Sequence, residues 1–564
     1  MSADTPALPE LVRQLEIAAD LLELLGEEKF RVAAYRNAAR SLESVPDSLE
    51  ELLHRRFAGV PKVGKGLAAE LLDASQTGRL AALEETAAQI PPGVLALFRV
   101  RGLGPKKIRS LWNAGLDSPE RLQAAAASGE LAALPGFGAK SAATLLEAVT
   151  FSLAAQERQS LAAGQQVSQA LQQRLAAYAP RPAGELRRQL ETLGEVTLTA
   201  AATPEQLEEA LADLSLTAVP GGVHGQLDGV PFTVLGADQT RRGALDALLS
   251  GPENWTQALH AAAAAGGLRL ESTGLYRGKE ALNTPGEADV LRLLGCPQRP
   301  AVYREPEHAA LWPDLPPEGE LLRPSDIRGM LHTHSTWSDG LNTVAEMVEA
   351  ALALGHSYLG TGDHSRAAHY ANGLSLERLQ LYTAEIRELQ RAGLPVLAGA
   401  EVDILADGSL DYPDEVLAEL DYVVVSVHSH FGLSREAQTE RLVRAVSHPL
   451  VTLLGHPTGR LLRRRPGYDV DISAVLGACE ANQTAVEINA SPYRLDLDWR
   501  EALKWRGRLT FAVNTDAHSV AGLSDLQYGL AVSQKAGLTA KDVVNALSLS
   551  AFRDFVKRQR AGRA

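Results

Sequence analysis

The strongest constraint on the fold lies in the C-terminal half, where short apolar runs alternate with longer helical stretches. From Asp326 onward such runs occur at residues 329–333, 357–362, 395–400, 421–427, 450–455, 484–489 and 509–514. Segments such as VAEMVEAALALG, with apolar residues at helical spacing, separate most of them. Strands that alternate with helices form parallel sheets. The sequence therefore predicts a closed or nearly closed α/β barrel of seven units.

Side chains that bind metals follow nearly every predicted strand. They are His332, His334, Asp339, His364, Glu401, His428, His456, Asp516 and His518. In barrels of this kind the chemistry gathers where the strands end, and two side chains two positions apart on a strand share one face. Imidazole and carboxylate without thiolate suit Zn²⁺, Mn²⁺ or iron. Nine ligands are too many for one ion, so the pattern predicts a cluster of two or three ions in which a shared carboxylate bridges two.

A cluster of this type favours the hydrolysis of phosphoesters. The segment GHPTGRLLRRRPGY follows with four arginines; we predict that Arg460 clamps a phosphate, whereas the triplet 463–465 is either a second anion contact or a solvated face. Four further histidines lie outside the strand-end pattern and are predicted bystanders: His356, His369, His430 and His448.

Residues 1–150 carry a different signal, a glycine-containing turn between apolar helical stretches that occurs three times, as GVPKVGKG, VRGLGPKK and LPGFGAK. Glycine lets the backbone approach a phosphate, the following helix offers free N–H groups and a positive dipole end, and lysine adds charge. Such turns predict contacts with the DNA backbone rather than the bases; the alternative is three glycine-capped hairpins that serve packing alone. The predicted contacts are Gly64, Lys65, Gly66, Gly102, Gly104, Lys106, Lys107, Gly136, Gly138 and Lys140.

Composition limits the remaining possibilities. The net charge of −14 excludes a protein coated in basic surface, so DNA would have to bind at local sites. Two cysteines exclude a disulfide framework, and the absence of a long apolar run or of a signal pattern predicts a cytoplasmic protein with no membrane contact. Between the two halves, EVTLTAAA and GVPFTVLGA are predicted strands among alanine-rich helices.

The motifs LHTHSTWSDG, GTGDHS, GAEVDIL, SVHSHF, GHPTGR, EINASPYRLDL and NTDAHS resemble those of the PHP (polymerase and histidinol phosphatase) domain, most closely as it occurs in bacterial family X DNA polymerases. FRVAAYRNAARSLE and the three hairpins are similar to the first domains of that family. The resemblance, over residues 10–560, implies a multidomain α/β protein. Its parts would be a helical DNA-binding domain with a helix-hairpin-helix motif (1–85), a fingers-like domain with two such motifs (86–150), a nucleotidyltransferase palm (151–236), thumb and linker (237–319), and a distorted (β/α)7 PHP barrel with 3′→5′ exonuclease activity (320–564).

The same resemblance implies how the nine ligands divide among three metal positions. One would use His332, His334, Glu401 and Asp516. A second would share Glu401 and add His428 and His456, and a third would use Asp339, His364 and His518. Glu401 is thus the predicted catalytic bridge, and Mn²⁺ or Zn²⁺ are the predicted ions.

The palm departs from the family pattern of Gly-Ser, Arg-Arg and three aspartates. Arg187 and Arg188 are kept, but Glu185 replaces the serine, and Glu195 and Thr197 stand where two aspartates are expected; Thr233 occupies the position predicted for the third. Two-metal nucleotidyl transfer needs bridging carboxylates, and loss of one should cost several kcal/mol, or roughly thousandfold in rate. This weakens the case for Mg²⁺ or Mn²⁺ in the palm and predicts little or no templated synthesis. Likewise, Glu70 stands where lyase-active relatives carry a Schiff-base lysine.

The leading hypothesis is a monomeric DNA-repair enzyme that binds gapped or ended DNA and trims 3′ ends. Three alternatives stay open. One is an active polymerase with an Mn²⁺-tolerant palm in addition to the exonuclease. The others are a non-catalytic scaffold that bridges DNA ends, and a phosphatase of small molecules.

Overall fold

The computed structural model describes residues 8–44 and 49–562, and the chain divides into two compact units between residues 157 and 158. The first unit is helical. Its helices are α1 (Leu8–Leu25), α2 (Lys29–Ser44), α3 (Leu49–His54), α4 (Lys65–Thr77), α5 (Ala81–Ala87), α6 (Pro92–Ala96), α7 (Pro105–Asn113), α8 (Pro119–Ser128), α9 (Glu130–Ala133) and α10 (Ala139–Gln156). Two apolar clusters form its core, one around α1 to α4 and one around α7 to α10, and α1 contributes to both.

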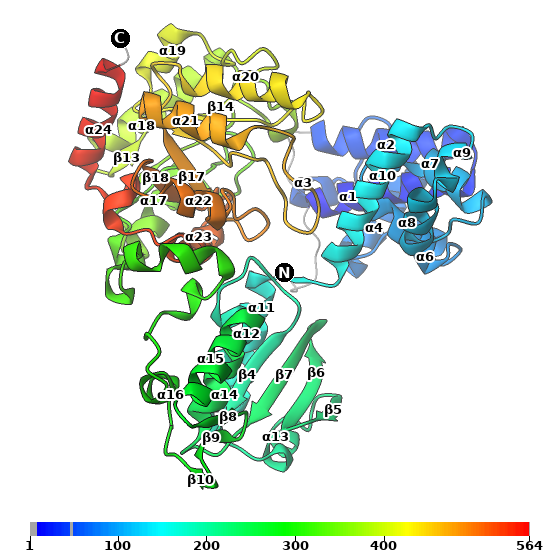
Figure 1. Cartoon of the computed structure of the whole chain (residues 1–564). Coiled ribbons are helices and arrows are strands. Elements are labelled where there is room, and N and C mark those ends of the chain that lie inside the picture. Colours follow the sequence, from blue (N-terminus) through cyan, green and yellow to red (C-terminus); the bar gives the residue numbers. More distant parts are fainter. Residues whose placement is uncertain (1–7, 45–48, 563–564) are drawn as a thin grey trace. The chain divides into compact units, whose positions relative to one another are not determined.

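The second unit begins with a mixed five-stranded sheet in the order β2-β4-β7-β6-β5 (Figure 1). Its strands are β2 (Arg181–Ala183), β4 (Val196–Ala200), β5 (Leu216–Val219), β6 (Gly222–Leu227) and β7 (Val230–Gly236). The predicted strands EVTLTAAA and GVPFTVLGA form the parallel pair β4 and β7, in which Thr197 pairs with Thr233. Helices α11 (Leu161–Arg174), α12 (Gly184–Arg187) and α13 (Pro204–Ala210), with the small β1–β3 pair (Gln159–Ser160, Thr192–Leu193), complete this part.

A smaller helical part with its own apolar core follows. It comprises α14 (Arg242–Leu249), α15 (Glu253–Ala265), α16 (Glu287–Leu293) and an antiparallel sheet of β8 (Arg269–Glu271), β9 (Gly274–Arg277) and β10 (Glu280–Ala281). A proline-rich segment of short 3₁₀ turns, residues 301–326, leads into the C-terminal part.

The C-terminal part consists of parallel strands surrounded by helices (Figure 1). One sheet has the order β11-β12-β13 and the other β14-β15-β16-β17-β18. The strands are β11 (Gly329–Met330), β12 (Tyr358–Gly360), β13 (Val396–Leu397), β14 (Glu401–Asp403), β15 (Val424–Ser426), β16 (Leu453–Leu454), β17 (Ala485–Asn489) and β18 (Phe511–Asn514). The helices are α17 (Val344–Ala353), α18 (Leu376–Arg391), α19 (Asp414–Glu419), α20 (Arg435–Val446), α21 (Ile472–Asn482), α22 (Trp499–Trp505), α23 (Leu526–Lys535) and α24 (Leu549–Ala561).

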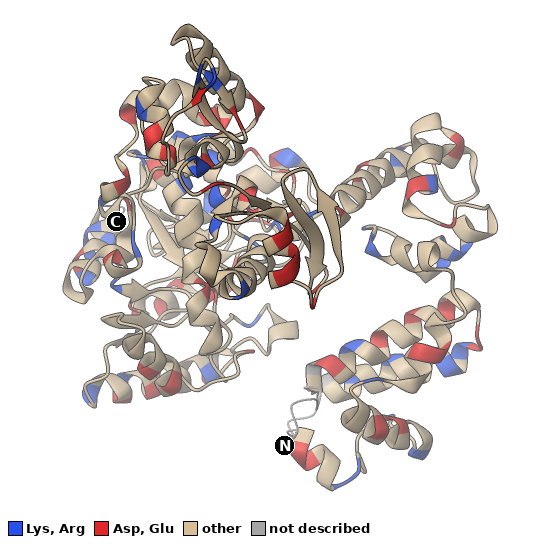
Figure 2. Cartoon of the chain, turned by 90° about the horizontal axis from the view of Figure 1, so that it is seen from below, with Lys and Arg blue, Asp and Glu red and all other residues tan. Residues whose placement is uncertain are grey.

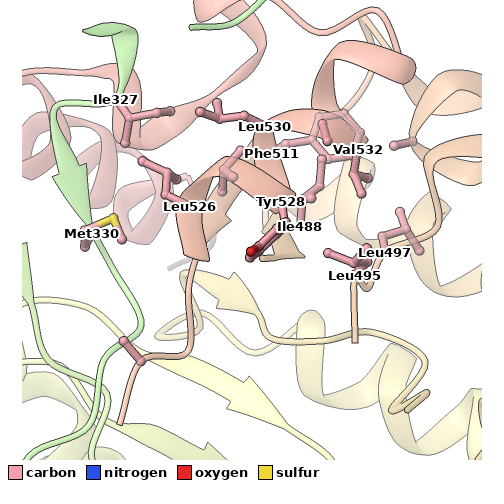
Figure 3. Packing of buried hydrophobic residues seen from close by; sticks show 14 of the residues in the cluster. Ile327, Met330, Ile488, Leu495, Leu497, Phe511, Leu526, Tyr528, Leu530 and Val532 are labelled. Atoms are coloured by element: carbon pink, nitrogen blue, oxygen red, sulfur yellow. The ribbon is translucent and has the colours of Figure 1, made fainter. Parts of the chain in front are cut away.

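Parallel bridges join the two sheets at both edges, between Thr333 and Ala517 and between His364 and Glu401. Strands β13 and β14 are successive pieces of one extended segment and count as one strand of the barrel. The eight strands therefore form a distorted seven-stranded barrel, as the alternating pattern predicted. Apolar side chains of α23, among them Leu526, Leu530 and Val532, pack with those of β17 and β18 (Figure 3). This packing sets the strand ends, and therefore the ligands that follow them.

Buried ion pairs join the sheet part of the second unit to the barrel. Lys535 is fully buried at the end of α23, and its Nζ donates to the Arg188 carbonyl (3.0 Å) and to Glu305 Oε1 (3.2 Å). The Arg188 guanidinium donates to the same carboxylate (2.8 Å). Arg188 therefore has a structural role in this unit.

Lysines and arginines are interspersed with acidic residues over the ribbon (Figure 2). Over residues 8–44 and 49–562, no helix has both the length and the apolar character that crossing a bilayer requires. The division into five domains stays a prediction, because the structure separates only the two units.

Candidate metal centre

Glu401 lies at the centre of the site because it opens β14, at the mouth of the barrel. Its Oε1 lies 2.9 Å from His456 Nε2, 3.2 Å from His428 Nε2 and 3.3 Å from His332 Nε2. Its Oε2 lies 2.9 Å from His364 Nδ1. The side chain is fully buried, yet neither oxygen accepts a hydrogen bond from any described residue. A buried carboxylate without donors is costly unless a cation neutralises it.

A second group of ligands adjoins the first. Asp339 Oδ2 lies 3.4 Å from His518 Nε2 and 3.6 Å from His364 Nε2, and its Oδ1 lies 3.7 Å from His334 Nδ1. Asp516 Oδ1 connects the groups, 3.0 Å from His334 Nε2 and 3.5 Å from His332 Nε2.

The structure thus brings all nine residues singled out from the sequence into one cluster. Sets whose ligand atoms can share an ion are His334 with Asp339, His364 and His518; His332 with His334 and Glu401; and His364 with Glu401 and His428. His334, His364 and Glu401 each fall in two sets, and the division among three metal positions that the resemblance implies stays a prediction.

Burial and neighbouring charges act on the titratable groups of the cluster in opposite directions. Glu401 and Asp403 outweigh burial and raise the pKa of His428 to about 10, whereas His334 and Glu401 have the charge states that ligation requires. Burial, together with the neighbouring His518 and His364, lowers the pKa of His334 to about 4, so its imidazole is neutral at pH 7. Burial alone would raise the pKa of Glu401, but His428 and His332 outweigh it and hold that pKa well below its usual range. A neutral imidazole beside an ionised carboxylate is the state in which both bind a metal. The unpartnered Nε2 of His332 and Nδ1 of His334, both fully buried, fit the same conclusion.

Two carboxylates that the sequence reasoning missed hold the ligands in position. Glu487 Oε1 lies 2.8 Å from His332 Nδ1, and its Oε2 accepts the His456 backbone N–H (2.8 Å). Asp403 Oδ1 lies 3.3 Å from His428 Nδ1. A carboxylate on one ring nitrogen fixes the tautomer and aims the other nitrogen at the metal. The available signal was a glutamate inside the otherwise apolar strand TAVEIN.

Arg460, predicted to clamp a phosphate, is paired within the protein instead. Its guanidinium donates to Asp498 Oδ2 (2.6 Å) and to the carbonyls of Arg494 and Leu495, and the side chain is only 16% exposed. It therefore braces the loop that follows β17. Arg494 from that loop reaches the cluster instead, with its Nε 3.5 Å from Asp516 Oδ2.

The four histidines predicted as bystanders belong to none of the ligand sets; the sets also leave out His456 and Asp516, but these two lie 2.9 Å from Glu401 and 3.0 Å from His334. His356 is buried and bonds the Ile327 carbonyl, and His448 pairs with Asp414 at 3.2 Å. His369 and His430 are exposed.

The palm residues form a hydrogen-bonded set with no group of three metal ligands among the described residues. The Thr233 hydroxyl donates to Glu195 Oε2 (2.8 Å), and His224 Nδ1 lies 3.1 Å from that hydroxyl. Glu185 accepts the Gly194 N–H (2.7 Å) and pairs with Arg158 (3.0 Å). Arg187 pairs with Glu287, and Thr197 lies in β4 beside Thr233.

The three glycine turns of the first unit have the geometry of anion-binding helix starts. Helices α4, α7 and α10 begin directly after Gly64, Gly104 and Gly138. A Cβ built on any of these three glycines, or on Gly66 and Gly136, would meet no heavy atom within 4 Å. Internal packing therefore does not demand a bare backbone there, whereas a close external approach would.

The lysines of these turns, Lys65, Lys106, Lys107 and Lys140, are exposed. Gly102 and Gly136 have positive φ (87° and 88°), which favours glycine for the turn itself. At the position of the lyase lysine, Glu70 accepts hydrogen bonds from the Tyr35 hydroxyl (2.8 Å) and the Ala82 N–H (2.9 Å), so its role is structural.

Comparison with known proteins agrees with these features. Residues 6–80 match a helix-hairpin-helix domain, residues 94–149 a SAM-like helix-hairpin-helix tandem and residues 330–491 a PHP domain. The chain is 31% identical, over 97% of its length and 99% of the relative's, to the DNA polymerase/3′-5′ exonuclease PolX of Bacillus subtilis. It is also similar to a probable phosphatase of Clostridium acetobutylicum (32%, over 28% of this chain and 63% of that protein) and to one of Thermoanaerobacter sp. (28%, over 41% and 94%).

Proposed function

The chain belongs to the bacterial family X DNA polymerases that carry a C-terminal PHP domain, and we propose that it is a DNA-repair enzyme that hydrolyses DNA from the 3′ end at the Glu401 cluster. The observation that carries the proposal is the fully buried Glu401 carboxylate, surrounded by imidazoles and without a hydrogen-bond donor among the described residues. Full burial of so many unpartnered ligand atoms is hard to explain without cations.

The donor set fits two or three ions of Mn²⁺ or Zn²⁺: seven of the nine cluster residues fall in sets that could hold an ion, His456 and Asp516 adjoin them at Glu401 and His334, and Glu401 would be the shared ligand. Such ions supply a nucleophilic water of lowered pKa and stabilise charge on the phosphate. The chain's own residues orient the reaction: Glu487 and Asp403 fix the imidazoles of His332 and His428, and the Arg494 guanidinium is placed to hold a phosphate oxygen.

We further propose that the three glycine turns bind the backbone of gapped or ended DNA. Exposed lysines beside open glycines and helix starts support this, and contacts of that kind carry no base preference. A monomer acting in the cytoplasm would be sufficient for this function.

Polymerase activity is proposed to be weak or absent by the usual mechanism. The carboxylate of Glu195 accepts a hydrogen bond from Thr233, and that of Glu185 accepts one from the Gly194 N–H, so both carboxylates are already paired within the protein. The alternative, an active polymerase with an Mn²⁺-tolerant palm, predicts primer extension with Mn²⁺ and nucleotides that Glu195→Ala abolishes. We expect no such Glu195-dependent extension.

The test of the main proposal is digestion of a 5′-labelled single-stranded oligonucleotide with Mn²⁺, comparing wild type with Glu401→Gln. Stepwise shortening from the 3′ end that disappears in the variant is expected. Preference for a phosphate monoester such as p-nitrophenyl phosphate would favour the phosphatase alternative. DNA binding without any hydrolysis would favour the end-bridging scaffold.

A further inference from the structure

Tyr370 occupies an unusual position beside the metal cluster. It lies six residues after His364, in a 3₁₀ turn (His369–Ala371) that follows β12. Its ring centroid is 6.2 Å from that of His364 and 6.4 Å from that of His428. Although its ring lies near those of His364 and His428, the residue is 72% exposed. The ring therefore has one side on the cluster and a large area open to solvent.

The segment that carries Tyr370 is firmly held. The N–H groups of Ala368 and Gly373 donate to the carbonyls of Ser365 and Ala368 (both 3.1 Å), and Leu374 N–H donates to the His364 carbonyl (2.9 Å). Arg378 from α18 donates to the Asn372 carbonyl (2.7 Å). A Cβ at Gly373 would lie 2.0 Å from the Ser365 carbonyl oxygen, so the turn is closely packed. The exposed ring is thus presented in a fixed place.

Exposed aromatic side chains are rare in this protein. Over residues 8–44 and 49–562, the strongly exposed Phe, Tyr and Trp side chains are Phe30, Tyr370 and Tyr493. Tyr493 directly precedes Arg494, whose guanidinium reaches Asp516. Of the two strongly exposed tyrosines of the second unit, Tyr370 therefore makes ring contacts with the metal cluster, and Tyr493 precedes the arginine that pairs with Asp516. An aromatic ring that stays solvent-exposed at a fixed position is available to a planar partner.

We propose that Tyr370 stacks on a nucleobase next to the scissile phosphate while Arg494 holds that phosphate, so that the cluster selects nucleic-acid ends over small phosphate monoesters. Every base offers a π face, so such a contact is tolerant of sequence, as trimming of arbitrary ends requires. The base has to be unpaired to stack, so the preferred substrate is a single-stranded or frayed 3′ end. This inference rests on the proposed exonuclease function and names its substrate determinant.

The experiment uses the full-length protein with Mn²⁺ and two oligonucleotides of equal length. One has ordinary thymidines at its 3′ end, and in the other the last two nucleotides are abasic tetrahydrofuran residues. KM and kcat for the first cleavage are measured for wild type, Tyr370→Ala and Tyr370→Phe, with Leu381→Ala as a control at another exposed apolar position, on α18. Thermal melting of each variant checks that the fold is retained.

With wild type, removal of the bases should raise KM about tenfold, the effect of one lost base–aromatic stack. Tyr370→Ala should raise KM by about the same factor on the ordinary oligonucleotide and leave the abasic one unchanged. Tyr370→Phe should retain the wild-type values, since it keeps the ring, and Leu381→Ala should match wild type on both substrates.

Equal losses on both substrates for Tyr370→Ala, or a change confined to kcat, would overturn the stacking proposal, because the residue would then act on the cluster. No effect on either substrate would overturn it as well. Failure of wild type to shorten either oligonucleotide would instead refute the exonuclease function itself, so the two failures are distinguishable.

Discussion

The second unit carries two sets of polar side chains, one at the strand ends of the barrel and one on the palm sheet, and they differ in how their atoms are paired. In the barrel, both oxygens of Glu401 and ring nitrogens of His332, His334 and His456 are buried without a hydrogen-bond partner among the described residues. In the palm, Glu195 accepts from Thr233, which in turn contacts His224.

Only one of the two sets has polar atoms that call for a partner from outside the protein. A buried carboxylate or imidazole left unpaired costs free energy that a bound cation recovers, whereas a set that pairs internally is already satisfied. The barrel cluster therefore has buried, unpaired atoms that cations would bind, whereas the palm side chains pair within the protein.

The largest effect is expected from replacing the central carboxylate. Glu401→Gln removes the bridging charge and should lower the rate of 3′-end digestion at least about thousandfold, equivalent to about 4 kcal/mol of transition-state stabilisation. Initial rates on a labelled oligonucleotide with Mn²⁺ measure it. The matched change in the palm, Glu195→Gln, should leave digestion within twofold of wild type; equal losses in both variants would remove the contrast.

Substitution of Arg460 is expected to lower the stability of the fold, whereas substitution of Arg494 is expected to lower the rate of catalysis. Arg460→Gln breaks a largely buried pair with Asp498 and should lower the free energy of unfolding by about 3 kcal/mol. Arg494→Gln should leave thermal melting nearly unchanged while lowering kcat about ten- to hundredfold.

Urea unfolding and digestion rates measured on both variants provide the check on these arginines. The reverse assignment, with Arg460→Gln stable but inactive, would restore Arg460 as the phosphate clamp.

His308 is a buried histidine outside the metal cluster that also has an unpaired ring nitrogen. Its variants therefore show whether such a nitrogen is by itself enough to bind a metal. It is fully buried, stacked on Trp499 at 4.9 Å, with Nε2 2.7 Å from the Lys535 carbonyl and Nδ1 unpartnered among the described residues. Burial lowers its pKa to about 4, below the 6.5 of the unfolded chain. Since the unfolded state takes up the proton first, stability is complete above pH 6.5 and is lost as pH falls toward 4.

Between pH 7 and pH 5 the loss from His308 should be about 2 kcal/mol. Chemical unfolding of metal-free protein at the two pH values measures it, with His308→Gln as the variant that lacks this pH dependence. We expect no Mn²⁺ stabilisation that depends on His308. An identical acid loss in the variant would show that another group is responsible.

The smallest effect is expected from the exposed histidines His369 and His430. His430→Ala and His369→Ala should each change digestion less than about twofold, because surface substitutions away from ligands are nearly neutral. Rates measured beside His428→Ala, which loses a ring 3.2 Å from Glu401, give the contrast. A large loss for His430→Ala would make it a tenth member of the cluster.

Much of the site could be predicted from the sequence because barrel topology forces strand ends together. Once strands and helices alternate, residues as distant as His332 and Asp516 must meet at one mouth, and the convergence of nine side chains follows. The glycine turns could be predicted equally well, because the start of a helix after a glycine depends on neighbouring residues alone.

The hydrogen-bond and ion-pair partners of these side chains could not be predicted from the sequence, because they depend on packing between segments that are far apart in the chain. The sequence alone determined the ligand types, their place after each strand and the departure of the palm from three aspartates. Only the tertiary structure decided that Arg460 pairs with Asp498 while Arg494 contacts the cluster. It also decided that Glu487 orients the imidazole of His332. The physical reason is that the role of a polar group depends on which partner lies within hydrogen-bonding distance. Three-dimensional contacts determine that partner, and residue type does not.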